Sequence, residues 1–283
     1  MKKVLTIVAV ALAAVCAASC CGGVHEARES VLVGEHRGSD DFNIGVAGYT
    51  FRKFTIDETL SALQEMGVHY MSVKDFWLPI NSSVEEMEAF KAKCAEYGVE
   101  PYILGPIYMH SAEDIDAAFE YVARFGHKMF IGVPDYELLD YMISKVKATG
   151  IKVAIHTHGP DKMPFPNITD IVKRVGDPAI GVGCCMDLGH SVRYGDDLLK
   201  DISDYREWIY DIHIKDETAA SDAGRTWEMG RGVMNFVPII KALRAIDYQG
   251  KISVEFEKNA EHPALGTAES VGYLRAVCDL TAE

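Results

Sequence analysis

The sequence has few cysteines and no CxxC pair. Seven cysteines occur in 283 residues, and three of them lie within the first 21. Disulfide-rich folds and thiolate zinc sites need denser and more regular cysteine spacing, so neither is expected here. We expect the other four to be small buried hydrophobic side chains, namely Cys94, Cys184, Cys185 and Cys278.

An excess of basic residues is also missing. The chain has 28 Lys and Arg against 42 Asp and Glu, which gives a formal net charge of −14. A surface of this charge repels the phosphate backbone, so we expect no nucleic-acid partner. Apolar residues make up 48% and charged residues 25%, a composition typical of a globular protein with a substantial core.

Long apolar runs are confined to the N-terminus. Lys2 and Lys3 precede the uncharged run VLTIVAVALAAVCAASC, which is typical of an export signal and too short and alanine-rich for a membrane span. Small residues before Cys20 are similar to a bacterial lipoprotein cleavage site, although Ala17 stands where Leu is usual. We therefore expect an exported protein, periplasmic or anchored to the membrane only through a lipid at Cys20.

The chain divides into three predicted parts. Residues 21–41 are rich in glycine, serine and charge, which is typical of a tether rather than a folded segment. The predicted parts are a signal peptide at 1–20, a linker at 21–41 and a single catalytic domain at 42–283.

Past residue 42, short β-branched or aromatic runs alternate with amphipathic stretches of helical period. Several helical stretches end at a glycine just before the next strand, as at Gly67 and Gly250, because a helix C-cap commonly needs a left-handed residue. Strict alternation predicts parallel strands, and eight such units favour an α/β fold of the (β/α)8 TIM-barrel type. An open doubly wound sheet is the alternative, but no GxGxxG follows the first strand. The predicted strands are 43–48, 69–75, 101–106, 128–133, 151–157, 180–187, 208–214 and 251–257.

Ionisable residues gather at the ends of the last four predicted strands. These ends carry His156 with His158, then Asp187, then His213, then Glu255. A single residue of this kind is usually structural, but active sites of TIM barrels form at these strand ends, and four similar ends together predict a site. Imidazole and carboxylate groups suit transition metals better than Ca²⁺, so we expect one divalent ion: Mn, Co, Zn, Fe or Mg.

Four segments carry further motifs. They read NIGVAGYTFRKF, MDLGH, DIHIKD and GRGVMNFVPIIKALRAIDYQGKISVEFE. Together they resemble the xylose isomerase-like barrels, the sugar phosphate isomerase/epimerase family, over nearly all of residues 43–280. The resemblance implies a metal-dependent enzyme acting on a small sugar. It implies these roles: Asp187, His213 and Glu255 as metal ligands, His190 at the substrate beside the ion, and Lys74 at the pocket wall.

One position departs from the family pattern. Sugar epimerases of this group usually carry a Glu, both ligand and catalytic carboxylate, at the strand that here reads VAIHTH. Either His156 or His158 can replace it as a ligand, and we favour His156 by position. Glu255 is then the only carboxylate base that matches the family pattern. Epimerisation by two bases needs one acidic residue on each face of the reacting carbon, so this departure speaks against it.

The predicted chemistry is proton abstraction beside a carbonyl group, through an enediolate that a divalent ion stabilises. Glu255 is the expected general base, and His190, His158 or Lys215 the group that returns a proton. Isomerisation, epimerisation or elimination can follow. The export signal favours a free keto-sugar or a 3-keto-glycoside over a sugar phosphate.

Three other residues are candidates for substrate contact. Arg231, within GRG, is either a substrate clamp or part of a surface ion pair. Trp77 and Phe51 follow the second and first strands and either form a wall for sugar stacking or pack the top of the barrel.

Alternatives to an isomerase or epimerase remain. A lyase or hydrolase of keto-glycosides can use the same barrel. AP endonucleases share the fold, but they need more His and acid ligands than the chain offers. A non-catalytic sugar-binding lipoprotein would keep the pocket and lose the metal. The sequence gives no prediction of oligomeric state.

Overall fold

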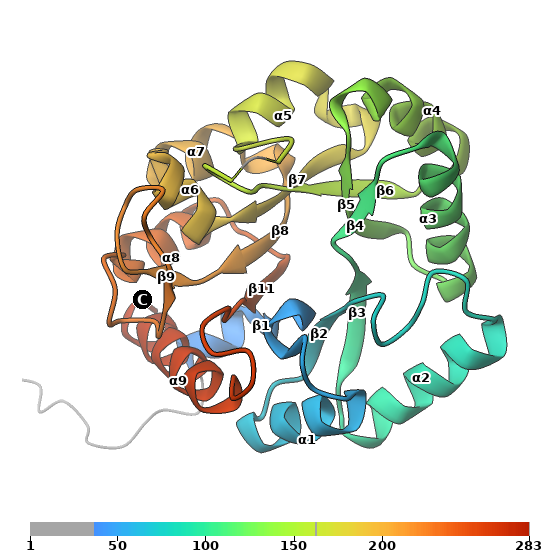
Figure 1. The fold of residues 1–283 in the computed structure, drawn as a ribbon. Helices are drawn as coiled ribbons and strands as arrows, with labels where there is room; N and C mark the ends of the chain where they lie inside the picture. The colour runs from blue at the N-terminus through green and yellow to red at the C-terminus, as the bar shows by residue number, and fades with distance from the viewer. Residues whose placement is uncertain (1–36, 162, 283) are drawn as a thin grey trace, which may run out of the picture. The chain divides into compact units, whose positions relative to one another are not determined.

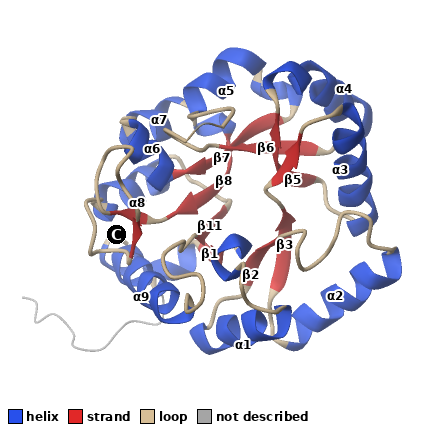
Figure 2. Ribbon diagram, viewed as in Figure 1, coloured by secondary structure: helices blue, strands red, loops and turns tan. Residues whose placement is uncertain are grey.

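The computed structural model describes residues 37–161 and 163–282. Within them, a parallel sheet curls into a barrel and helices surround it (Figures 1 and 2). The strand order is β3-β2-β1-β11-β8-β7-β6-β5-β4. The predicted TIM barrel is therefore confirmed, whereas the expected signal peptide and the lipid site at Cys20 lie outside the described residues.

Eight barrel positions are built from nine strands. β3 pairs with β2, and β4 pairs with β5, so these two short strands share one position. They are separated because Gly105-Pro106 interrupts the strand predicted at 101–106, and proline has no N–H to donate to a neighbouring strand. The strands are β1 (Asn43–Val46), β2 (Tyr70–Val73), β3 (Glu100–Leu104), β4 (Ile107–Met109), β5 (Met129–Pro134), β6 (Lys152–His156), β7 (Val182–Asp187), β8 (Ile209–Ile214) and β11 (Lys251–Val254), with a separate antiparallel pair, β9 (Asp216–Glu217) and β10 (Thr226–Trp227).

The helices form the outer ring (Figure 2). The first one shows the local signals: Thr55 accepts a hydrogen bond from Glu58 N, and the helix ends at Gly67 with φ of 62°. The α-helices are α1 (Ile56–Met66), α2 (Val84–Glu96), α3 (Ala112–Phe125), α4 (Leu139–Thr149), α5 (Ile168–Val175), α6 (Leu188–Tyr194), α7 (Leu198–Asp204), α8 (Phe236–Ala245) and α9 (Ala264–Leu280). The 3-10 helices are η1 (Gly38–Asp41), η2 (Gly48–Phe51), η3 (Tyr136–Leu138), η4 (Pro178–Ile180) and η5 (Arg206–Trp208).

The apolar interior has two parts. The larger lies between the sheet and the helices, and Cys184 belongs to it. A small cluster of Ile103, Ile131, Ala154 and Cys185 packs separately. Adjacent cysteines fall into different clusters because side chains alternate along β7. All four cysteines that were predicted to be buried are buried and free.

Residues 38–41, which were assigned to the predicted linker, form η1. η1 contacts the last two helices, since Ser39 N donates to Asp279 Oδ1 of α9 over 2.7 Å and Arg244 Nη2 of α8 donates to Gly38 O over 2.8 Å. Gly38 is buried. Residues 38–41 are therefore part of the folded domain. Among the described residues, no helix is both long and apolar enough to cross a membrane.

Candidate metal centre

Four side chains converge at the C-terminal end of the barrel. His156 ends β6, Asp187 ends β7, His213 lies near the end of β8, and Glu255 directly follows β11. One potential ligand atom of each lies within 4.8 Å of the others, and all four residues are buried. These four strands are neighbours in the sheet, so the set predicted as metal ligands is brought together by the fold itself.

The distances within this cluster fit a bound cation. His156 Nε2 is 3.1 Å from His213 Nδ1, which in turn is 3.5 Å from Glu255 Oε1. Asp187 Oδ2 lies 3.7 Å from His156 Nε2, and the Lys215 ammonium pairs with it from the edge of the cluster. Four potential ligand atoms thus face one another in a buried space, and a cation between them would offset the cost of burying two carboxyl groups there. Two imidazoles and two carboxylates form a donor set suited to Zn, Co, Fe or Mn.

His158 lies beside this cluster rather than in it. Its ring centroid is 4.8 Å from that of His156, and its Nε2 is 3.2 Å from the Tyr108 hydroxyl. Burial and the nearby Lys215 ammonium lower the pKa of His158 to about 4, so the imidazole is neutral. The geometry thus distinguishes the two histidines that the sequence left open: His156 belongs to the ligand cluster, and His158 to the wall.

Lys215 places a positive charge at the edge of the cluster. Its Nζ is 2.9 Å from Asp187 Oδ2 and 2.8 Å from Glu255 Oε2, and it also contacts the Glu257 carboxylate. Burial lowers the pKa of Lys215, but these carboxylates outweigh it and raise the pKa well above its usual value. Lys215 is therefore a fixed cation and a poor proton donor.

Arg193 sets the tautomer of His190. Arg193 Nη1 lies 3.1 Å from His190 Nδ1, and a guanidinium group can only donate, so Nδ1 accepts and Nε2 carries the hydrogen. That Nε2 faces the cluster, 3.8 Å from Asp187 Oδ2 and 3.2 Å from Lys215 Nζ, whose hydrogens point to the carboxylates of Asp187, Glu255 and Glu257 rather than to His190. Burial and Lys215 lower the pKa of His190 well below its usual value. The neutral imidazole thus points its Nε2–H donor toward the cluster, where a substrate oxygen can accept it.

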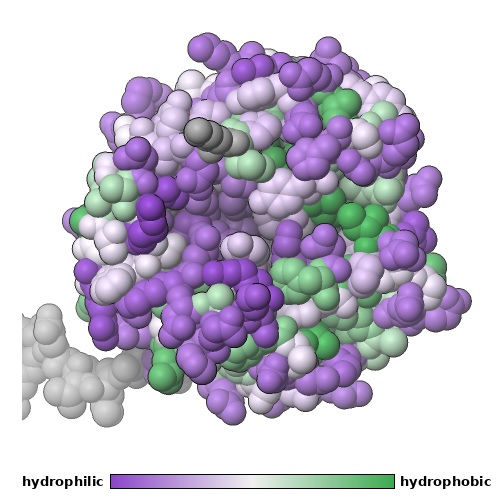
Figure 3. Space-filling view, viewed as in Figure 1, coloured by the Kyte–Doolittle hydropathy of each residue, from purple (hydrophilic) through white to green (hydrophobic). Residues whose placement is uncertain are grey.

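The cavity above the cluster has a volume of about 300 Å³. Lys74 lines it, as the resemblance implied, and its Nζ donates to Pro106 O. Burial lowers the pKa of Lys74, and the nearby carboxylates do not outweigh this effect as they do at Lys215. In Figure 3, hydrophilic residues surround a recess near the middle of this face. The lining residues are Tyr49, Lys74, Pro106, Tyr108, His156, His158, Asp161, His190, Glu255 and Glu257.

Three candidate substrate contacts lie elsewhere. Trp77 Nε1 donates to Phe54 O over 2.9 Å, and its ring is packed against the apolar core. Phe51 is completely buried. Arg231 pairs with Glu269 over 2.8 Å, and 58% of its side chain is exposed. None of the three lines the cavity, so packing and a surface ion pair describe their positions.

The GRG motif wraps a carboxylate that the sequence analysis did not single out. Asp216 accepts hydrogen bonds from the backbone N–H groups of Gly230 and Gly232, both over 2.9 Å, and from two others, those of Glu217 and Met234. A Cβ atom at Gly232 would lie 2.3 Å from Asp216 Oδ1, so glycine is required there. Asp216 therefore anchors the loop 217–235 beside the metal centre.

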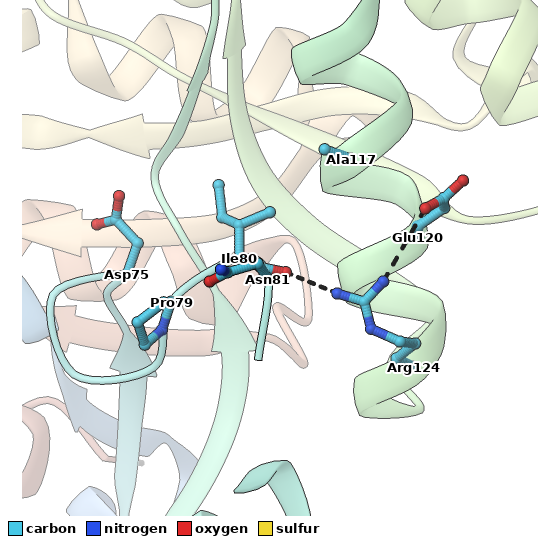
Figure 4. A pocket seen from close by; sticks show the side chains of 7 residues that line it. All are labelled: Asp75, Pro79, Ile80, Asn81, Ala117, Glu120 and Arg124. Atoms are coloured by element: carbon cyan, nitrogen blue, oxygen red, sulfur yellow. Dashed lines mark hydrogen bonds and ion pairs between the residues drawn. The ribbon is translucent and has the colours of Figure 1, made fainter. Parts of the chain in front are cut away.

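A separate depression lies at α3, outside the barrel mouth (Figure 4). Its volume is about 420 Å³. Arg124, its main cation, already donates to Ile80 O and pairs with Glu120. The charge of Arg124 is thus paired within the chain, and none of the four clustered side chains of the barrel mouth lines this depression.

Solved structures with the same fold include sugar enzymes. A protein from Parabacteroides distasonis is 25% identical, with a TM-score of 0.63, covering 83% of this chain and 99% of that one. The 3-keto-D-glucoside 4-epimerase YcjR of E. coli is 19% identical, with a TM-score of 0.64, covering 83% and 99%. The IolI protein, crystallised with a zinc atom, is 14% identical, with a TM-score of 0.69, covering 85% and 99%.

Among curated protein sequences, none matches significantly. A family-level match is clear, however, because residues 60–277 match the family described as the xylose isomerase-like TIM barrel. That segment is most of the chain and includes all four clustered side chains. The chain belongs to the xylose isomerase-like TIM-barrel family.

Proposed function

We propose that this protein is a divalent-metal-dependent isomerase or epimerase of a small keto-sugar. The observation that carries the proposal is the buried cluster of His156, Asp187, His213 and Glu255 at the floor of a polar cavity. The epimerase activity of the similar E. coli structure and the zinc in the IolI structure support it. A bound ion supplies Lewis-acid polarisation of the substrate carbonyl.

The chain's own residues would then move the proton on the adjacent carbon. Glu255 is the proposed base: burial raises its pKa, but Lys215 and His213 outweigh this and hold the pKa well below its usual value, so it is ionised. His190 donates to the substrate oxygen. Lys74, whose pKa is lowered, is better suited than Lys215 to return a proton, and the neutral His158 is the other candidate.

The charges of the cavity favour a neutral substrate. Lys215 is already surrounded by three carboxylates, and Lys74 Nζ has Asp75 at 3.9 Å. No unpaired cation is left among the lining residues to hold a phosphate group. A free keto-sugar or keto-glycoside therefore fits better than a sugar phosphate.

Elimination or cleavage of a keto-glycoside is the second candidate reaction. It is favoured by His156, because the position that supplies a second catalytic carboxylate in sugar epimerases of the family holds an imidazole here. NMR of the products in D₂O separates the reactions: a deuterated isomer supports isomerisation, and a released aglycone supports elimination.

The test of the site combines metal analysis with activity. We expect one transition-metal ion per chain in the purified protein and loss of metal in Asp187→Ala and in His213→Ala. Arg231→Ala, which removes an exposed ion pair, is the matched control and keeps the metal. Wild-type protein that takes up no Mn, Co or Zn, and turns over no ketose or 3-keto-glycoside, would overturn the proposal in favour of a sugar-binding protein.

Export is part of the proposal. The basic start and apolar run of residues 1–20 support an exported protein, with lipid attachment at Cys20. Fractionation of the wild type and of Cys20→Ala tests it. Recovery of uncleaved wild type from the cytoplasm would contradict it.

A further inference from the structure

A second polar cavity adjoins the candidate metal centre. It has a volume of about 510 Å³, and three of its lining residues, Asp161, His190 and Glu257, also line the first cavity. The rest of its wall includes Trp227 from β10 and Arg193 from α6. Both cavities have the size of a small-molecule site, so one ligand can extend from the metal centre into the second cavity.

The cations of this second cavity already have partners within the chain. Arg193 Nη2 is 3.1 Å from Asp161 Oδ1, and its Nη1 donates to His190. Arg225 Nη1 donates to Asp222 O over 3.1 Å. Lys258 Nζ is 2.8 Å from a Glu228 carboxylate oxygen. The lining also contains four acidic residues against these three cations, so the charges do not favour a phosphate or a carboxylate.

Two lining residues of the second cavity have buried atoms without partners in the described part of the chain: the donor Nε of Arg193 and a carboxyl oxygen of Glu217. Glu217 lines the second cavity and is only 1% exposed, and its Oε2 atom has no hydrogen-bond partner within the described part of the chain. Its other oxygen lies close to Gly189, where a Cβ atom would come within 3.0 Å of it. The carboxyl group is thus held in place by packing. A buried acceptor of this kind is satisfied by a ligand that brings a hydrogen-bond donor, such as a hydroxyl group.

Trp227 provides an apolar surface in the same cavity. Lys258 Nζ lies 3.4 Å from the centroid of the Trp227 ring and fixes one face by a cation–π contact. The residue is only partly buried. An indole surface beside hydrogen-bonding groups suits a ligand with apolar C–H faces and a hydroxyl rim, which is the surface of a sugar ring.

We propose that this second cavity, built around Trp227 and Glu217, is a subsite for a second sugar unit. The substrate is then a keto-glycoside of at least two rings, with the reacting ring at the metal centre and the neighbouring ring against Trp227. The identity of the reacting ring rests on the proposed function, whereas the subsite rests on the cavity itself.

The experiment compares two substrates of the metal-loaded protein. One is 3-keto-glucose, and the other is a glucose disaccharide oxidised at C3 of one ring. We expect wild type to prefer the disaccharide in kcat/KM. Trp227→Ala and Glu217→Gln should each lower kcat/KM for the disaccharide by about tenfold, the equivalent of one good buried contact, and leave that for 3-keto-glucose unchanged. Arg231→Ala, on the same loop but outside both cavities, is the control and should alter neither.

Equal loss for both substrates, or no preference in wild type, would overturn the subsite. Failure of the proposed function is a distinguishable outcome, because wild type would then turn over neither substrate. Calorimetric titration with the unoxidised disaccharide decides the subsite in that case. Binding that Trp227→Ala and Glu217→Gln abolish supports it, and the absence of binding to wild type overturns it.

Discussion

Asp211 and His213 lie two residues apart on the same face of β8, and Asp211 Oδ2 is 3.8 Å from His213 Nε2. His213 Nδ1 faces the cluster of candidate ligands, so Nε2 is the atom left to carry the hydrogen. Nε2 makes no hydrogen bond among the described residues, and the Asp211 carboxyl group interacts with it electrostatically across 3.8 Å. Tyr102 Oη, in turn, donates to Asp211 over 3.1 Å. A carboxylate behind a ligand histidine fixes its tautomer and strengthens it as a ligand.

Asp211→Asn is therefore expected to weaken metal binding by roughly 10- to 100-fold, the usual effect of losing such a partner. Chelator competition on the purified protein measures it. Ser253→Ala removes a hydroxyl that contacts Tyr102 rather than His213, and it should change the metal affinity far less. Equal affinities in wild type and Asp211→Asn would show that Asp211 does not position His213.

The imidazole of His156 should determine which divalent metal the site prefers. Because an imidazole stands where the family usually has a carboxylate, the four ligands carry two negative charges instead of three. Imidazole favours Zn and Co, whereas carboxylates favour Mg and Mn. We expect wild type to prefer Zn or Co over Mg in competition, and His156→Glu to shift the preference toward Mn and Mg by on the order of tenfold. A wild-type preference for Mg would contradict this account.

The barrel and the clustering of the four candidate ligand side chains could be predicted from the sequence because both depend on local patterns. Helix caps and strand periodicity define each β/α unit, and parallel strands bring their C-terminal ends together wherever such units close into a barrel. His156, Asp187, His213 and Glu255 were therefore identifiable without coordinates. Choosing between His156 and His158 required the structure, since two side chains of the same parity both reach the barrel mouth.

Residues from loops and from the far side of the barrel were harder to predict. Tyr108 reaches the cavity from β4, a strand that exists because Gly105-Pro106 divides the third barrel position. Arg193 and Trp227 lie in no motif, and their roles depend on contacts with His190 and Lys258. The sequence made Arg231 the candidate residue of the GRG segment. The structural role of the segment is instead that its two glycine N–H groups donate to Asp216. Such long-range contacts leave no periodic signal in the sequence.

Arg193→Met is expected to lower kcat by at least about tenfold, because His190 then loses the donor that fixes Nε2–H toward the substrate. Arg193 also lowers the pKa of His190, so the variant should lose activity at a higher pH than wild type as pH falls. Steady-state pH profiles from pH 5 to 9 measure both effects. Arg231→Met, which removes an exposed cation outside both cavities, is the control. An unchanged kcat and profile in Arg193→Met would mean that His190 needs no partner.

Asp216→Ala is expected to release the loop 217–235, since four backbone N–H groups lose their acceptor. Each hydrogen bond to a charged group contributes roughly 1.5–3 kcal/mol. Hydrogen exchange should therefore accelerate in this loop by well over tenfold while the barrel strands stay protected. Asp222→Ala, in the same loop, removes a side chain without such contacts and serves as the control. Equal exchange rates in Asp216→Ala and wild type would show that the loop is held by other contacts.

Asp201 lies on the buried face of α7, and it should make the free energy of unfolding depend on pH. Burial, with the neighbouring Asp196 and Asp197, raises the pKa of Asp201 to about 6. The folded state therefore binds a proton more tightly than the unfolded chain, where the pKa is about 3.9. This contribution to stability is complete below about pH 4 and is lost as pH rises through about 6. At neutral pH, the ionised Asp201 is an unfavourable buried charge. Asp201→Asn should match wild type near pH 4 and exceed its Tm at pH 7.5, as measured by calorimetric melting at both values. A variant that is destabilised equally at both pH values would show instead that the Asp201 carboxyl group makes a contact that Asn cannot replace.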